Sequence, residues 1–117
     1  MAESITLRAV GDMMLGSTYP DSRDMPPSDG REILSDVGPL LRSADITFGN
    51  LEGPLTEGGV TQKTGPNSYA FRTPPRYGRY FKNAGFDIVS VANNHANDFG
   101  ERGRNSTVAA LDRLGIE

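Results

Sequence analysis

The chain has 117 residues, of which 36% are hydrophobic and 23% charged, a composition typical of a soluble globular domain. Its formal net charge of -3 gives no basic excess of the kind that binds nucleic acid. Because there is no cysteine, disulfides and thiolate metal sites are excluded, and a metal would need oxygen and imidazole ligands. No apolar run approaches the roughly 20 residues that span a bilayer, and residues 1–4 lack the features of a signal peptide.

The N-terminal third predicts one strand and one helix. Residues 5–10 form a β-prone run that ends at Gly11, so we expect a first strand that delivers Asp12 to its carboxyl end. Residues 17–30 are rich in proline and should be irregular. Ser28 or Asp29 then caps a predicted helix that Gly38-Pro39 interrupts, because proline lacks a backbone donor. Its apolar side at helical spacing comprises Ile33, Leu34, Val37, Leu40 and Leu41.

The middle of the chain predicts a second strand and helix. Residues 45–49 are β-prone and lead directly into Asn50 and Glu52. The glycine-rich connection 53–73 is long, and its β-prone residues 69–72 indicate a minor hairpin. Thr73 is predicted to cap a helix that Gly85 ends. The apolar side of this helix comprises Tyr77, Tyr80, Phe81 and Ala84, which we interpret as core residues.

The last third repeats the pattern. Residues 88–92 predict a strand buried on both faces, as in parallel sheets, and polar residues follow it. Among them Asp98 is expected either to hold the imidazole of His95 or to begin a helix. A third amphipathic helix, marked by Val108, Leu111 and Leu114, ends at Gly115, and residues 116–117 look like the start of a further strand. The alternation predicts an α/β fold, a βαβαβα parallel-sheet segment within one domain over residues 1–117, and we expect that more of the domain follows.

Polar residues follow all three predicted strands. Carboxyl ends of parallel strands share one edge, where open α/β sheets bind their ligands. We therefore expect one site formed by Asp12, Asn50, Glu52, Asn94 and His95. Carboxylates, amides and one imidazole suit Mg, Mn, Fe, Zn or Ca as a divalent metal cofactor, with His95 as general acid. The alternative is that these residues only cap helices or bond their own backbone in turns.

Several motifs together resemble the CapA family of bacterial capsule and poly-γ-glutamate synthesis proteins. They are Gly11-Asp12-Met13-Met14-Leu15-Gly16, residues 44–52 ending in Asn50-Leu51-Glu52, residues 69–75, and Gly85-Phe86-Asp87 with residues 92–100 around Asn94-His95. That family is similar to the calcineurin-like metallophosphoesterases, which implies part of a metallophosphatase-like α/β sandwich. The resemblance makes Asp12 and His95 the candidate catalytic residues, with Asp12, Asn50, Glu52, Asn94 and His95 as metal ligands.

Two residues depart from the metallophosphoesterase pattern. Met14 stands where the first motif has histidine, and neutral Asn50 replaces a bridging aspartate. Glu52 is the candidate replacement carboxylate.

The resemblance implies a membrane-associated, outward-facing protein that acts with other capsule-synthesis membrane proteins on an anionic polymer or a phosphoester, and not on nucleic acid. The alternative is a non-catalytic polymer-binding subunit in which Lys63, Arg72 and Arg76 contact carboxylates. A third alternative is that this chain is an inactive fragment whose unpaired sheet edges are covered by self-association.

Overall fold

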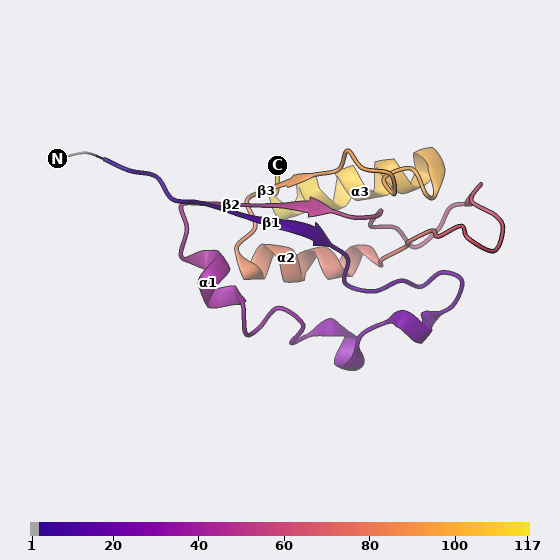
Figure 1. Cartoon of the computed structure of the whole chain (residues 1–117), viewed down its shortest axis with the longest axis horizontal. Coiled ribbons are helices and arrows are strands. Elements are labelled where there is room, and N and C mark those ends of the chain that lie inside the picture. Colours follow the sequence, from indigo (N-terminus) through magenta and orange to yellow (C-terminus); the bar gives the residue numbers. More distant parts are fainter. Residues whose placement is uncertain (1–2) are drawn as a thin grey trace.

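Three parallel strands, β1 (Leu7–Met13), β2 (Ile46–Leu51) and β3 (Ile88–Ser90), pair in the order β1-β2-β3 (Figure 1). The computed structural model describes residues 3–117. Helices α1 (Gly38–Arg42), α2 (Gly78–Ala84) and α3 (Gly100–Leu114) follow the three strands in turn. The predicted α/β class, with a parallel sheet and βαβαβα order, is confirmed.

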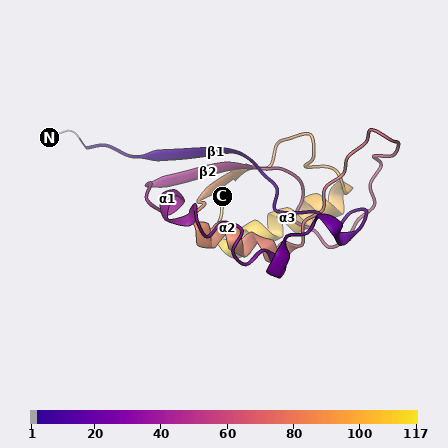
Figure 2. The ribbon, with the colours of Figure 1, turned by 60° about the horizontal axis from the view of Figure 1, so that its bottom comes forward.

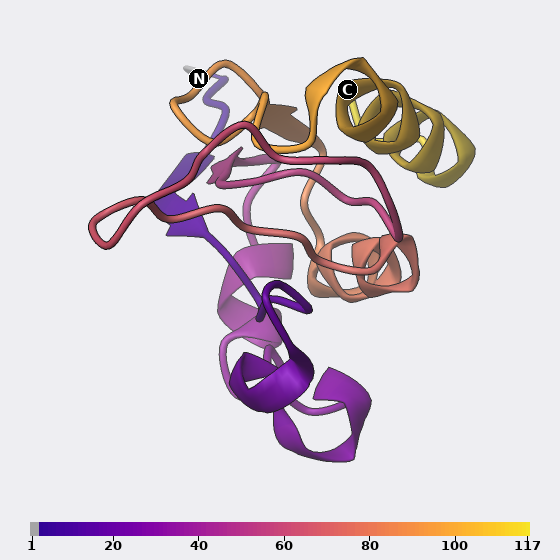
Figure 3. The same ribbon diagram turned by 90° about the vertical axis from the view of Figure 1, so that its right-hand side faces the viewer.

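The helices lie together on one face of the sheet, as the two rotated views show (Figures 2 and 3). On that face Thr47 and Leu51 of β2 and Val89 of β3 are buried. The other face is open, and there Ile46 is 41% and Ile88 40% exposed. The prediction that the third strand is buried on both faces is wrong, because no element of residues 3–117 covers this second face.

Helix α2 packs a row of aromatic side chains against the sheet. Tyr77, Tyr80, Phe81 and Ala84 are buried as predicted. Gly85 ends the helix with φ 101, a left-handed conformation that glycine adopts without a Cβ clash.

The start of α2 differs from the prediction. The helix is preceded by the 3-10 turn η3 (Pro75–Tyr77), whose N-cap Pro74 makes no side-chain capping bond. The hydroxyl of Thr73 instead donates to the carbonyl of Gly16 at 2.7 Å. Thr73 is therefore not the helix cap, because its hydroxyl ties two distant loops together.

The predicted helix after residue 28 is largely wrong. Two 3-10 turns, η1 (Ser22–Asp24) and η2 (Pro27–Gly30), precede α1, and Ser28 and Asp29 have φ of 54 and 52. These left-handed values cannot begin an α-helix. Helix α1 starts only at Gly38, with Pro39 in its first turn, where proline is favoured. Of the predicted apolar side only Leu41 is buried, Leu34 is partly buried, and the exposed members are Ile33, Val37 and Leu40.

The long connection and the C-terminus complete the fold. A single parallel bridge between Leu55 and Thr73 stands in place of the expected hairpin. Helix α3 ends at Gly115 as predicted, although Val108 on its expected apolar side is 51% exposed. The backbone of Glu117 donates to the carbonyl of Asp87 (3.0 Å) and accepts from the amide of Val89 (2.8 Å). Residue 117 thus pairs with β3 as the beginning of a parallel strand would.

Across residues 3–117, no helix has both the length and the apolar character that crossing a bilayer requires.

Candidate functional site

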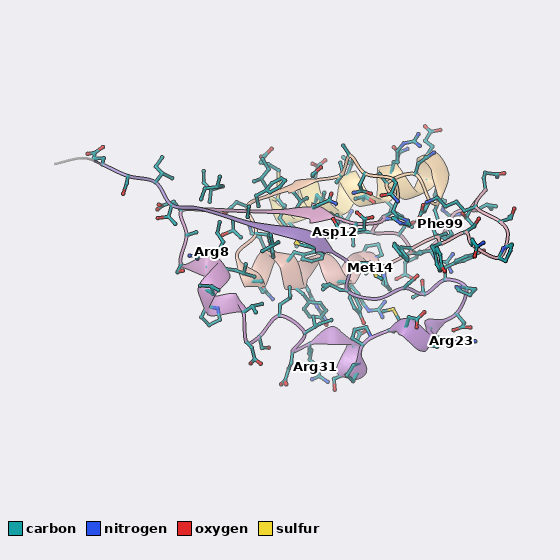
Figure 4. All side chains as sticks on the ribbon, in the orientation of Figure 1. Arg8, Asp12, Met14, Arg23, Arg31 and Phe99 are labelled. Atoms are coloured by element: carbon teal, nitrogen blue, oxygen red, sulfur yellow. The ribbon has the colours of Figure 1, made fainter. Side chains whose placement is uncertain are left out.

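A β-bulge aims Asp12 at the site. The register pairs Ala9 with Phe48 and Asp12 with Asn50, so two residues of β1, Val10 and Gly11, oppose one residue of β2. Without this extra residue Asp12 would be in register with Leu51 and face the helices, because side chains alternate along a strand. The bulge therefore places the carboxylate of Asp12 on the open face, beside Asn50 at the carboxyl end of β1 (Figure 4).

The side chain of Asn50 joins the two carboxylates. Its Nδ2 donates to Oδ1 of Asp12 at 2.7 Å and to Oε2 of Glu52 at 2.9 Å. Its Oδ1 accepts from Nδ2 of Asn93 at 3.1 Å, and Asn93 also donates to the carbonyl of Leu51 at 2.8 Å. Both donors of one amide are therefore directed at acidic oxygens, and Asn93, in the turn after β3, fixes the orientation of that amide.

The two ring nitrogens of His95 face two different carboxylates. Nε2 lies 3.7 Å from Oε1 of Glu52, and Nδ1 lies 2.7 Å from Oδ2 of Asp98. The backbone N–H of His95 donates to Oδ1 of Asn93 at 3.0 Å. The ring of Phe71 stacks on the imidazole with centroids 4.1 Å apart. The ring is thus held at one nitrogen and on one face, and Nε2 points toward the carboxylate of Glu52.

Asp98 holds the imidazole of His95 at Nδ1. Its side chain is fully buried, and Oδ2 accepts from the backbone N–H of Phe71 at 2.7 Å as well as facing His95. The ammonium of Lys63 lies 2.5 Å from Oδ1, which has no other partner among the described residues. Lys63 also donates to the carbonyl of Asn94 at 3.0 Å. Of the two roles expected for Asp98, the structure shows the first, since α3 begins at Gly100 with Phe99 as its N-cap.

The structure brings together four of the five predicted site residues, Asp12, Asn50, Glu52 and His95. The side chain of Asn94 is exposed and makes no hydrogen bond to the other four, whereas that of its neighbour Asn93 joins the cluster. The sequence does not indicate which of these two consecutive asparagines faces inward, because that depends on the conformation of the turn. Lys63 and Phe71 also belong to the site, and both lie in the long connection 53–73. Nothing in the sequence marked them as site residues, because they are far from His95 along the chain.

The donors have the chemistry of a site for a hard divalent cation. Asp12 and Glu52 supply carboxylates, Asn50 an amide and His95 an imidazole nitrogen, which are ligands that Mg, Mn, Fe, Zn and Ca take in proteins. No three His, Asp or Glu side chains within residues 3–117 are grouped closely enough to hold an ion by themselves. The amide of Asn50 lies between the two carboxylates.

Met14 lies outside this cluster. Its side chain is 38% exposed, and its sulfur accepts a hydrogen bond from the N–H of Gly16 at 3.2 Å (Figure 4). A thioether is a soft ligand and would not replace histidine toward a hard cation.

The three basic residues considered for polymer binding have partners within the chain. Arg72 bonds Thr18 through Nε at 3.1 Å, and its guanidinium lies 5.0 Å from the ring centroid of Phe99. Arg76 pairs with Asp29 at 2.8 Å. Lys63 pairs with Asp98, as described above.

Comparison with known proteins gives consistent matches over nearly the whole chain. A family profile described as "Bacterial capsule synthesis protein PGA_cap" matches residues 6–117. The capsule biosynthesis protein CapA of Bacillus anthracis is 27% identical over 98% of this chain and 28% of its own length. The PGA biosynthesis protein CapA of Bacillus subtilis is 27% identical over 92% of this chain and 28% of its own length.

An uncharacterized protein of Sinorhizobium fredii, y4sH, is 32% identical over 99% of this chain and 24% of its own length. The chain therefore spans about a quarter of the length of the curated relatives that it matches.

Proposed function

Because the chain belongs to the bacterial capsule synthesis protein family PGA_cap, we propose that it is the N-terminal portion of a metallophosphatase-like domain acting on an anionic cell-surface polymer. The role would lie in synthesis, export or processing of that polymer. Two relatives named for capsule and PGA biosynthesis support this reading. We propose a location at the cell envelope, facing outward, and membrane proteins of capsule synthesis as partners.

One observation carries the proposal of a chemical site. Asn50 links the carboxylates of Asp12 and Glu52, and Nε2 of His95 faces the same group while Asp98 holds Nδ1. Asp12, Asn50 and Glu52 would hold a divalent cation, a turn adjustment would add the exposed amide of Asn94, and Nε2 of His95 would stay available for proton transfer. The bound ion would supply Lewis acidity toward a phosphoryl or carbonyl oxygen.

The protein's own residues would handle the proton. His95 is positioned to donate a proton from Nε2 to the leaving oxygen of a phosphoester or the leaving nitrogen of an amide. Asp98 keeps the ring oriented through Nδ1. Phe71 covers one face of the ring and Asp98 occupies Nδ1, so Nε2 is the ring nitrogen left to meet a substrate.

The decisive experiment combines metal binding with turnover in the full-length protein. We expect Mn²⁺ to bind in calorimetry, and Asp12→Asn and Glu52→Gln to weaken that binding about 10 to 100-fold or more, because each loses a charged ligand. His95→Asn should lower kcat about 10²–10⁴-fold on a phosphoester or on the polymer. Glu32→Gln, an exposed carboxylate away from the site, is the matched control. Full turnover in His95→Asn would remove this mechanism.

A non-catalytic polymer-binding subunit is the second candidate. The observation in its favour is that the neutral NH₂ group of Asn50 donates a hydrogen bond to each of the two carboxylates, so each has a partner that is not an ion. In this case Mn²⁺ would not bind at this edge, His95→Asn would change no rate, and the polymer would bind elsewhere on the surface. The calorimetry and turnover measurements above separate the two candidates.

A further inference from the structure

A hollow between the α1 and α2 helices gathers three arginines. It has a volume of about 600 Å³ and is lined by Arg31, Arg42 and Arg79 with the polar groups of Ser35, Tyr80 and Asn83. Arg31 follows η2, Arg42 is the last residue of α1, and Arg79 lies in the first turn of α2. Three chain segments thus bring guanidinium groups to one concave surface. Figure 4 places Arg31 on the segment below α2, away from Asp12 at the end of β1.

The three arginines of this hollow form no ion pair with a carboxylate of residues 3–117. No acidic side chain lines it, and none of the ion pairs formed among residues 3–117 includes Arg31, Arg42 or Arg79. The nearby carboxylate of Asp29 is already bonded to Arg76 and to the hydroxyl of Tyr77. In a chain of net charge -3, such a local excess of cations is a distinct surface feature.

Two of the guanidinium groups are held in place by contacts that leave most of their donors free. Arg42 donates through Nη1 to the carbonyl of Asn83 at 2.9 Å, and it lies against Gly38 and Gly85, where a Cβ would come within 2.7 Å of its side chain. Arg79 donates to the hydroxyl of Tyr80 at 3.0 Å, with its guanidinium 5.0 Å from the ring centroid of Tyr80. A guanidinium has five N–H donors, so each arginine can still bind a carboxylate or phosphate.

From this arrangement we infer that the hollow binds a segment of a polyanion whose repeated carboxylate or phosphate groups pair with Arg31, Arg42 and Arg79. Its volume lies within the range of small-ligand sites, so it holds a short stretch of the polymer. Several charged groups on one flexible chain gain affinity from simultaneous pairing. The inference rests on the proposed function only for the choice of polymer, and it requires no catalysis.

The test measures binding of fluorescent polyglutamate and, separately, inorganic polyphosphate to the full-length protein. Arg31→Gln, Arg42→Gln and Arg79→Gln should each weaken binding about tenfold, the effect of one lost charge-assisted hydrogen bond. The control is Arg102→Gln, which removes the same charge from the exposed first turn of α3, and it should leave binding unchanged. Binding should also weaken as salt concentration rises.

The outcomes are distinct. Loss of polyglutamate binding alone identifies a carboxylate site, and loss of both polymers identifies a general anion site; either result supports the inference. Equal weakening by Arg102→Gln, or no weakening by the three variants, overturns it. The Arg31→Gln variant should stay folded, because the side chain of Arg31 is exposed and its hydrogen bond within the described chain is a 3.5 Å contact with the carbonyl of Ser28. Weaker binding by this variant therefore cannot be attributed to unfolding. Hydrolysis of a small phosphoester should be unaffected, so failure here and failure of the metal site are separate results.

Discussion

At the scale of single residues, Asp98 determines how His95 faces the site. Its buried carboxylate receives the N–H of Phe71 and lies 2.7 Å from Nδ1 of His95, with Lys63 paired to its second oxygen. A carboxylate can only accept hydrogen bonds here, so a proton belongs on Nδ1, and Nε2 is left facing the carboxylate of Glu52.

Replacing Asp98 by Asn should therefore release the ring. We expect Asp98→Asn to mix the two imidazole tautomers and to lower the free energy of unfolding by about 1–3 kcal/mol, since buried donors lose their acceptor. Because His95 is the only histidine, ¹⁵N NMR of its ring nitrogens reports the change directly. Glu101→Gln, in the exposed first turn of α3, loses the same charge and should leave the ring shifts unchanged. Unchanged shifts in Asp98→Asn would show that Asp98 does not position the ring.

At the scale of elements, Asp29 fastens the N-terminal turns to α2. It accepts from Arg76 at 2.8 Å and from the hydroxyl of Tyr77 at 2.9 Å, so η2 is tied to the start of the helix. The hydrogen bond from Arg76, followed by that from Tyr77, lowers the pKa of Asp29 from 3.8 to about 2. Burial, with the bond to Asp29, raises the pKa of Tyr77 to about 12.

This shift predicts a loss of stability in acid. A carboxyl whose pKa is lower in the folded state stabilises the fold fully above its unfolded value of 3.8, and this contribution disappears as the pH falls through about 2. The difference in Tm between the natural protein and Asp29→Asn should be constant above pH 5 and should shrink between pH 4 and pH 2. Asp112→Asn, an exposed carboxylate on α3 without an ion pair in the described chain, is the control. A Tm difference independent of pH would contradict this role.

At the scale of the whole molecule, one face of the sheet is left uncovered by residues 3–117. Leu7 and Ile46 are in register on this face, 65% and 41% exposed, and Ile88 is 40% exposed beside them. Figure 2 shows the helices gathered beneath β1 and β2, with no helix on the opposite side of these strands. An apolar sheet surface of this kind gains free energy when it is removed from water.

We expect the 117-residue chain to self-associate through this face and the free edge of β1. Sedimentation velocity should show a sedimentation coefficient that rises with concentration, and Ile46→Lys should reduce it by placing a charge on the surface. Val60→Lys is the matched control, because Val60 is 77% exposed but lies in the long connection, outside the sheet. A monomer at every concentration would contradict the expectation.

The sequence by itself determined the order of strands and helices, the parallel sheet and the family. Apolar runs and a glycine stop, such as residues 77–85, depend on local backbone preferences, so they could be recognised without coordinates. The sequence also predicted that one edge of the sheet carries Asp12, Asn50, Glu52 and His95, since parallel strands end together. Whether these residues hold a metal or catalyse a reaction stays a prediction.

Only the tertiary structure decided which neighbours meet across long distances. The bulge that turns Asp12 toward Asn50, the choice of Asn93 over Asn94, and the burial of Asp98 against Lys63 and Phe71 depend on packing between segments far apart in the chain. For the same reason the helix predicted after residue 28 did not form. Its apolar spacing favours a helix, but burial is a property of the surroundings, and this segment has too few neighbours to bury a helix face.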